Sequence, residues 1–167
     1  TPVGVEGLKS DEWQRLMWLN LFVPFRLIQA VLPSMKLRLS GTIVNISSYC
    51  GRRAIPNHAA YCASKFALRG LTEAVAKELD QWCGLVTVPC PIHIFSASPS
   101  GMDTQMRASL FGEEEASRQQ APAWVAGCIV DAIQGRIQVA DGGDLVLRHG
   151  KVTIMPPGGD VALPTMR

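Results

Sequence analysis

The stretch "GTIVNISSYCGRRAIPNHAAYCASKFALRGL", residues 41–71, decides the fold. It begins with a glycine and the β-branched apolar run Thr42 to Val44, which is too short and too continuous for a surface helix. This run predicts a strand buried on both faces, as strands in parallel sheets are. From about Ala59 to Trp82, apolar residues recur three and four positions apart among alanine, lysine and glutamate, which predicts a helix. A buried strand followed by a long helix favours a parallel sheet covered by helices.

The sequence on both sides of this stretch continues the alternation of helices and strands. Upstream, Ser10 is an expected N-cap with acidic residues in the first turn of a long helix that reaches Leu32. Downstream, the patterns predict a second buried strand, a loop or lid with one short helix, a third helix, and a last strand before a proline- and glycine-rich tail; these segments are residues 92–98, 101–120, 122–135 and 144–154. The order predicts an α/β fold with helices packed on a mostly parallel sheet.

Length and composition indicate one compact domain. The chain has 167 residues, of which 47% are hydrophobic and 18% charged, and its formal net charge is +2. The 16 basic and 14 acidic residues are scattered and form no stripe that could follow a phosphate backbone, which argues against nucleic-acid binding. The five cysteines form neither a C-x-x-C motif nor a Cys/His cluster with zinc spacing. We therefore expect free thiols, no metal site and a reducing, cytoplasmic setting.

One segment, Leu16 to Met35, has about the length of a membrane span. Polar residues and a proline interrupt it, namely Asn20, Pro24, Arg26 and Gln29. The interruptions predict a buried or interface helix and no membrane span. The sequence also lacks the charged start, apolar run and small-residue cleavage site of a signal peptide.

Several polar side chains follow the predicted strands, at the edge of an open sheet where ligands bind. Ser48 follows the first strand, and "SPSGMDT", residues 98–104, follows the second. Tyr61 and Lys65 stand four residues apart at the start of the intervening helix and therefore share one face. A lysine one turn away favours the tyrosine anion, and a serine hydroxyl can bond a substrate oxygen. This trio suits proton transfer to or from an alcohol or carbonyl, and the accompanying hydride transfer requires a nicotinamide cofactor.

These motifs, in this order, resemble those of the short-chain dehydrogenase/reductase family. "GTIVNISS" resembles the family strand that ends in the active-site serine, and Ser48 precedes Tyr61 by the usual 13 residues. "YCASK" resembles the family's Tyr-x-x-x-Lys motif. "DEWQRLMWLNLFVPFRLIQAVLPSM" resembles the helix that carries the active-site asparagine, here Asn20. "SPSGMDT" resembles the family's Pro-Gly-x-(Val/Ile)-x-Thr segment, with Ser100 in place of the glycine.

The resemblance implies a role for each of these residues. Tyr61 would be the general acid/base, and Ser48 would orient the substrate oxygen. Lys65 would lower the tyrosine pKa and bind the nicotinamide ribose, while Asn20 would hold a water that links the lysine to solvent. The residues implied in cofactor binding are Tyr61, Lys65, Pro99, Ser100, Met102 and Thr104. The implied cofactor is NAD or NADP, and the implied substrate is a small alcohol or carbonyl compound.

Some features depart from the family pattern. The glycine-rich turn that binds a dinucleotide pyrophosphate is absent from the sequence, since "GVEG" at residues 4–7 has the wrong spacing and no strand before it. We therefore expect a partial Rossmann-type, doubly wound fold without its N-terminal dinucleotide-binding half. In this interpretation residues 1–167 form a single incomplete domain, a fragment or truncated product, with a substrate loop at 105–120 and a tail at 151–167. Residues 85–91 are expected to form an irregular insertion.

Two functional hypotheses remain open from the sequence. The first is an NAD(P)-dependent oxidoreductase. The second is a truncated, inactive remnant that serves as a folding or dimerisation module, because helices of the family equivalent to 16–35 and 61–82 commonly pair across a homodimer interface.

Overall fold

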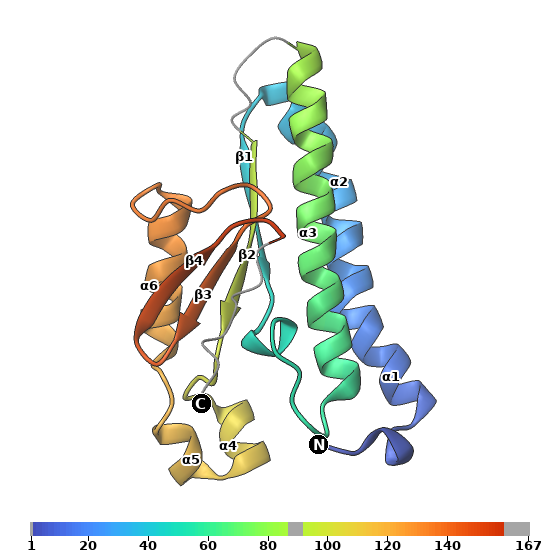
Figure 1. Cartoon of the computed structure of the whole chain (residues 1–167), viewed down its shortest axis with the longest axis vertical. Helices are drawn as coiled ribbons and strands as arrows, with labels where there is room; N and C mark the ends of the chain where they lie inside the picture. The colour runs from blue at the N-terminus through green and yellow to red at the C-terminus, as the bar shows by residue number, and fades with distance from the viewer. Residues whose placement is uncertain (1, 87–91, 159–167) are drawn as a thin grey trace, which may run out of the picture.

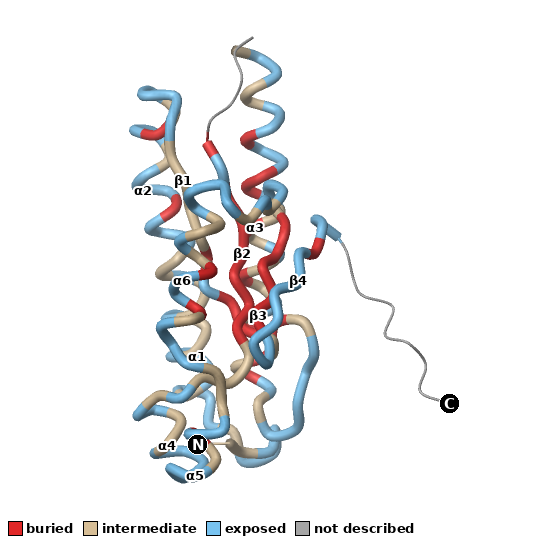
Figure 2. Tube along the Cα trace, turned by 90° about the vertical axis from the view of Figure 1, so that its left-hand side faces the viewer, coloured by how far each residue is buried: buried red, intermediate tan, exposed pale blue. Residues whose placement is uncertain are grey.

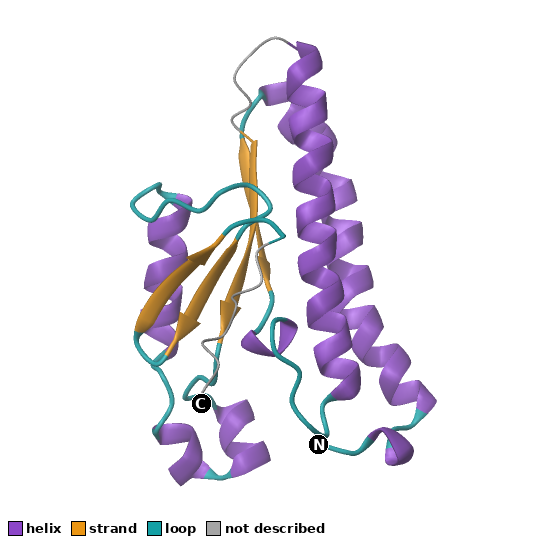
Figure 3. Cartoon of the chain, viewed as in Figure 1, coloured by secondary structure: helices purple, strands orange, loops and turns teal. Residues whose placement is uncertain are grey.

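The computed structural model describes residues 2–86 and 92–158. Its centre is a four-stranded sheet in the order β1-β2-β3-β4, in which β1, β2 and β3 are parallel and β4 is antiparallel to β3. Helices α2 and α3 cover one face of the sheet and α6 covers the other (Figures 1 and 3). The α/β fold class predicted from the alternation of helices and strands is therefore confirmed.

The predicted first helix is three consecutive segments that follow a short 3-10 turn, η1 (Val5–Gly7). They are α1 (Ser10–Met17), a π-helical segment η2 (Trp18–Phe22), and α2 (Val23–Arg38). Lys9 is the N-cap residue, so the prediction that Ser10 would be the cap is wrong. Only Ile28 and Met35 of α2 are buried, which makes most of this helix an exposed surface rather than part of the core.

The helix from Ser10 to Arg38 is also the one helix among the described residues that is long and apolar enough to cross a membrane. Little of it is buried within the chain. Length and composition are weak grounds for a span, because helices of soluble proteins meet the same criteria. The expectation of no membrane span stays a prediction.

The deciding stretch forms β1 (Gly41–Ile46), a 3-10 turn η3 (Tyr49–Gly51) and α3 (Ala59–Val86). β1 pairs along its whole length with β2 (Ile92–Pro99). β1 has no second strand neighbour in the described sheet and is half-buried, so the prediction of burial on both faces is wrong for β1. It is correct for β2, whose residues are buried apart from His93.

The segment after β2 contains more elements than the sequence analysis predicts. The loop or lid holds two short helices, α4 (Gln105–Phe111) and α5 (Glu113–Ser117), instead of one. The third helix is α6 (Pro122–Ile133), which begins with proline as expected.

The predicted last strand is a hairpin of two strands, β3 (Asp144–Arg148) and β4 (Lys151–Met155). His149 and Gly150 form its turn with φ angles of 49° and 71°, the left-handed pair that a two-residue hairpin requires. The tail predicted from residue 151 therefore begins after β4. Most of the predicted insertion at 85–91 lies outside the described residues, and residues 85–86 belong to α3.

Two apolar clusters, one on each face of the sheet, form the core, and Figure 2 shows buried residues concentrated on β2 and β3. On the α3 face, Val75 and Leu79 pack against Ile92 and Ile94. On the other face, Val125 and Cys128 of α6 belong to a cluster with strand residues such as Leu145 and Leu147. This packing fixes the carboxyl ends of the strands relative to the start of α3.

The cysteines match the expectation of free thiols only in part. Cys50, Cys62 and Cys128 are free, but Cys83 is disulfide-bonded. The expectation is therefore wrong for Cys83, which weakens the argument from free thiols to a reducing compartment.

Candidate active site

Ser48 and Tyr61 lie at the carboxyl end of β1, on the turn and the helix that follow it. Ser48 has extended backbone (φ −162°, ψ 158°) and caps η3, where its Oγ accepts a hydrogen bond from the Cys50 N–H at 3.1 Å. Tyr61 stands in the first turn of α3, and the Ser48 side chain is close enough to its phenol to favour the phenolate. Ser47 is the neighbouring serine, but its Oγ donates to the Lys65 carbonyl oxygen at 3.0 Å. The structure thus brings Ser48 rather than Ser47 to the tyrosine.

The pKa of Tyr61 is raised above its ordinary value, and burial is the largest cause. The nearby Ser48 hydroxyl acts in the opposite direction, because it favours the phenolate, while the Cys50 and Cys62 thiols raise the pKa further. Lys65 is not among the groups that shift this pKa, and the expectation that it lowers the tyrosine pKa stays a prediction. The phenol in this geometry therefore remains protonated beyond neutral pH.

Lys65 lies on the same face of α3 as Tyr61, as the four-residue spacing predicts. Its Nζ is 5.8 Å from the centre of the Tyr61 ring and donates a hydrogen bond of 2.9 Å to the Ile46 carbonyl oxygen. Burial lowers the pKa of this ammonium. The ammonium thus lies beside the Tyr61 ring, and one of its N–H groups is hydrogen-bonded to the last residue of β1.

Asn20 is held next to α3 by the π-helical segment η2. Its Nδ2 donates to Ser64 Oγ at 3.1 Å, and Ser64 Oγ donates to the Tyr61 carbonyl oxygen at 2.8 Å. Asn20 is therefore linked to the turn of α3 that carries Tyr61 and Lys65. Short π-helical segments inside helices are frequent at functional sites, because they turn side chains out of the ordinary register.

The segment after β2 approaches the same edge of the sheet. Pro99 ends β2, and Ser100 Oγ is buried without a hydrogen-bond partner among the described residues. Ser100 does not have a positive φ, so the serine at this position fits the loop without backbone strain. Met102 forms a bridge with Gln120, and Thr104 caps α4 by accepting a hydrogen bond of 3.2 Å from the Arg107 N–H.

Two contacts that build this site are visible only in the structure. Ser64, the serine of the "YCASK" motif, accepts a hydrogen bond from Asn20 and so connects Asn20 to α3. Gly51 is packed so closely that an added Cβ would lie 2.6 Å from Ser47 Oγ and 2.8 Å from the Lys65 carbonyl oxygen. Only the absence of a side chain at residue 51 lets the turn rest against α3.

Comparison with known proteins identifies the family. The family model for short chain dehydrogenases matches residues 2–115. The chain belongs to the short-chain dehydrogenase family. Trans-4-hydroxycyclohexanecarboxylate dehydrogenase of Sinomonas cyclohexanicum is 30% identical over 154 residues, which are 90% of this chain and 56% of that protein. The 17-beta-hydroxysteroid dehydrogenase 13 of Rattus norvegicus is 38% identical over 105 residues, 59% of this chain and 35% of that enzyme.

Solved short-chain dehydrogenases share the fold. A 4-hydroxyisoleucine dehydrogenase mutant complexed with NADH and succinate superposes with a TM-score of 0.73 at 28% identity, over 97% of this chain and 64% of that one. A short chain dehydrogenase from Escherichia coli CFT073 complexed with NADPH gives a TM-score of 0.69 at 28% identity, over 87% and 57% of the two chains. This chain therefore spans about a third to two thirds of the length of these relatives.

Proposed function

We propose that this chain carries the proton-transfer residues of an NAD(P)-dependent oxidoreductase that interconverts an alcohol and a ketone or aldehyde. The observation that supports the proposal most strongly is the convergence of Ser48, Tyr61 and Lys65 at the carboxyl end of β1. Asn20 joins them through Ser64. Solved relatives are complexed with NADH or with NADPH, so the proposed cofactor is NAD or NADP.

In the proposed reaction Tyr61 transfers the proton and Ser48 orients the substrate oxygen. In the reducing direction the Tyr61 phenol donates its proton to the carbonyl oxygen as the carbonyl carbon accepts a hydride. In the oxidising direction the phenolate accepts the proton of the alcohol. Because burial keeps the phenol protonated at neutral pH, the phenol can donate its proton to a carbonyl oxygen without first being protonated. The bound cofactor would supply or accept the hydride.

The residues at the end of β2 suit the nicotinamide end of such a cofactor. The buried Ser100 hydroxyl lacks a partner among the described residues and can bond a polar group of a ligand. We propose that Pro99, Ser100, Met102 and Thr104 face the nicotinamide and that Tyr61 and Lys65 bond its ribose. The sequence has no glycine-rich turn for the pyrophosphate, so the proposed contacts are restricted to the nicotinamide end.

The decisive experiment compares the two tyrosines of the chain. Purified protein is titrated with NADH and NADPH while tryptophan fluorescence and melting temperature are followed. Turnover is measured on two alcohols named in the relatives, trans-4-hydroxycyclohexanecarboxylate and a 17β-hydroxysteroid. We expect Tyr61→Phe to lower turnover by about 10²-fold or more while cofactor affinity is retained. Tyr49→Phe, whose hydroxyl accepts from Arg148, is the matched control. Absence of any cofactor response in the parent protein contradicts the enzymatic proposal.

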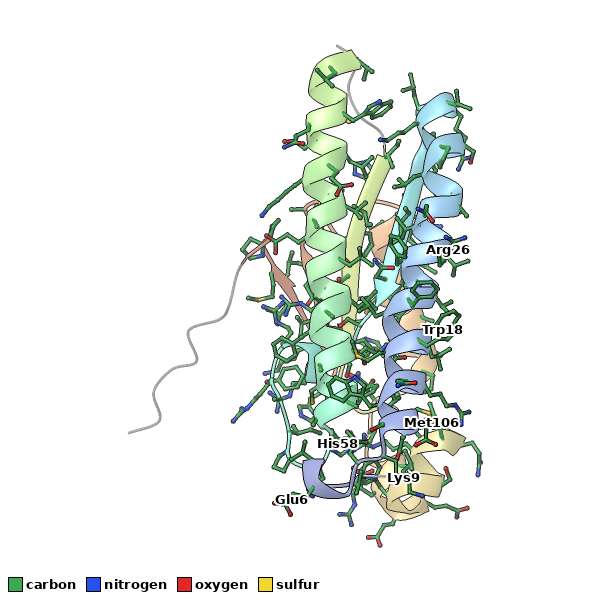
Figure 4. All side chains as sticks on the ribbon, turned by 90° about the vertical axis from the view of Figure 1, so that its right-hand side faces the viewer. Glu6, Lys9, Trp18, Arg26, His58 and Met106 are labelled. Carbon is green, nitrogen blue, oxygen red and sulfur yellow. The ribbon has the colours of Figure 1, made fainter. Side chains whose placement is uncertain are left out.

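A second candidate function, a dimerisation module, is favoured by the exposed helix surface. A groove of about 650 Å³ is lined by Gln14, by aromatic and apolar residues of α1, η2 and α2, and by Leu71 of α3. Trp18 lies along the outer surface of this helix (Figure 4) and is 58% exposed, and its ring stacks on Phe22 with centroids 4.3 Å apart. We propose a homodimer through helices 16–35 and 61–82. Sedimentation of the parent and of Trp18→Glu tests it, because a charge there should shift a dimer to monomer, whereas a monomeric parent excludes the interface.

A further inference from the structure

A buried ionic cluster lies against the turn that carries Ser48. Its centre is Asp144, the first residue of β3, which is 2% exposed. Asp144 Oδ2 accepts a hydrogen bond from Arg52 Nη1 at 2.7 Å and from Ser98 Oγ at 2.9 Å, and it lies 3.1 Å from Arg69 Nε. One carboxylate oxygen thus gathers groups from the turn, from β2 and from α3.

The cluster holds the turn at two successive residues. Arg52 follows η3 directly, so its ion pair ties the end of the turn to β3. Arg69 donates Nη1 to the Gly51 carbonyl oxygen at 2.8 Å while its Nε faces Asp144. Removing the carboxylate would take away the acceptor on β3 that both arginines share.

The turn is short and closed, so a shift at its end reaches Ser48. The Gly51 N–H donates to the Ser48 carbonyl oxygen at 2.8 Å, and the Cys50 N–H donates to Ser48 Oγ at 3.1 Å. Residues 48 to 52 are therefore connected by hydrogen bonds as well as by the chain. Displacement of Gly51 and Arg52 would move the Ser48 hydroxyl.

We propose that Asp144 is a positioning residue for the candidate active site: its buried carboxylate, through Arg52 and Arg69, holds the Ser48 hydroxyl beside Tyr61. Hydrogen bonds and ion pairs of Asp144 reach Arg52, Arg69 and Ser98, so Asp144 acts through the turn. The catalytic consequence of this positioning rests on the proposed function, whereas the geometric consequence at Tyr61 does not. The two consequences can therefore be tested separately.

The titration of Tyr61 reports the position of Ser48 without any turnover. The groups that face the phenol are Ser48 and Cys50 from the turn, and Cys62 and Lys65 from α3. Among them, only the Ser48 hydroxyl lowers the pKa of Tyr61, so moving this hydroxyl away from the phenol raises that pKa. The chain has two tyrosines, and a Tyr49→Phe background leaves Tyr61 as the sole one. Ring-fluorinated tyrosine, which ionises at lower pH, lets fluorine NMR follow the titration while the protein remains folded.

The test compares Asp144→Asn with Asp131→Asn in this background. Asparagine keeps the shape but removes the charge that both arginines face. Asp131 forms an exposed ion pair with Arg136 at 2.5 Å and serves as the control for the loss of a carboxylate. We expect Asp144→Asn to raise the Tyr61 midpoint by about 0.5–1 pH unit. We expect kcat to fall about tenfold to a hundredfold with little change in KM, because a displacement of about 1 Å has effects of this size. Asp131→Asn should change neither quantity.

Each outcome decides the proposal. A folded Asp144→Asn protein with an unchanged Tyr61 midpoint overturns it and leaves the cluster as an anchor of β3 and α3. If Asp144→Asn does not fold, Ser98→Ala removes one donor to the same oxygen without unpairing a charge, and it should move the midpoint in the same direction by less. An unmoved midpoint in a folded Ser98→Ala protein overturns the proposal too. If the parent protein shows no turnover, only the proposed function is contradicted. The midpoint of the Tyr61 titration still tests the positioning role of Asp144.

Discussion

Replacing Gly51 by alanine should destabilise the protein and disturb the candidate site together. Gly51 has no positive φ, so the backbone itself accepts alanine, and the effect depends on space alone. The new Cβ would lie 2.6 Å from Ser47 Oγ and 2.8 Å from the Lys65 carbonyl oxygen. The carbonyl belongs to α3 and is not free to rotate away. The serine hydroxyl is free to rotate, but only by giving up its 3.0 Å hydrogen bond to that same carbonyl.

The magnitude follows from these two contacts. Overpacking against a fixed backbone atom costs about 1–3 kcal/mol. Loss of the hydrogen bond from Ser47 adds about 1 kcal/mol. The free energy of unfolding should therefore fall by about 2–4 kcal/mol, which lowers the melting temperature of a chain of this length by about 4–16 °C. Circular dichroism at one fixed protein concentration measures the change and excludes an effect of self-association.

Gly70→Ala is the matched control. Gly70 lies in the interior of α3, is exposed, and has nothing within 4 Å of an added Cβ. Alanine should stabilise the helix there by about 1 kcal/mol, because glycine has the lower helix propensity. The two glycine-to-alanine changes are thus expected to have opposite signs. If Gly51→Ala unfolds within about 0.5 kcal/mol of the parent while Gly70→Ala behaves as expected, the close-packing argument is refuted.

Three further predictions concern the core, the pH dependence and the open strand edge. Thr72→Val should destabilise the protein by about 1–3 kcal/mol in urea unfolding, because Asn45 and Ser96 both donate to the buried Thr72 hydroxyl; Ser117→Ala, on the surface, should have almost no effect. The rate of carbonyl reduction should not depend on the Tyr61 ionisation from about pH 6 to 8 and should decline only above the raised tyrosine pKa. The rate of alcohol oxidation should rise toward alkaline pH. A decline of the reduction rate near neutral pH that depends on Tyr61 would contradict the burial argument. In hydrogen exchange, the amides of Thr42, Val44 and Ile46 should exchange faster than those of Ile43, Asn45 and Ser47, and equal rates in the two sets would show that the edge is covered.

Local sequence patterns predict where the helices and strands of this fold form, but they do not predict which strands lie next to one another. The apolar run of β1 and the helical periodicity of α3 depend on residues adjacent in sequence, and both elements form where expected. The failures depend on pairing. β1 looks like a doubly buried strand in sequence, but its burial is set by the single neighbour that it has in the described sheet. The β3–β4 hairpin was not predicted, because its turn sequence, His149-Gly150, is less typical of hairpins than Asn-Gly or Asp-Gly.

The candidate site divides along the same lines. Spacing alone predicts that Tyr61 and Lys65 share a helix face, and the turn after β1 brings Ser48 to them. The cluster around Asp144 was not predictable, because Arg52 and Asp144 are 92 residues apart in sequence. Its one local sign is an aspartate at the start of an otherwise apolar strand, "DLVL", where a buried charge requires partners.

Burial raises the pKa of Tyr61, and Lys65 is not among the groups that shift it, which fits the place where the Lys65 ammonium is bound. Groups on alternate residues of a strand point to opposite sides, and the Ser47 N–H points to β2, where it donates to the Ala97 carbonyl oxygen at 2.7 Å. The Ile46 carbonyl must then point to the open edge of β1, and it is this oxygen that Lys65 Nζ occupies at 2.9 Å. The lysine thereby satisfies an edge carbonyl, while its Nζ lies 5.8 Å from the centre of the Tyr61 ring. The four-residue spacing places the lysine beside the tyrosine on α3. The unpaired edge of β1 determines which oxygen accepts the hydrogen bond of the ammonium.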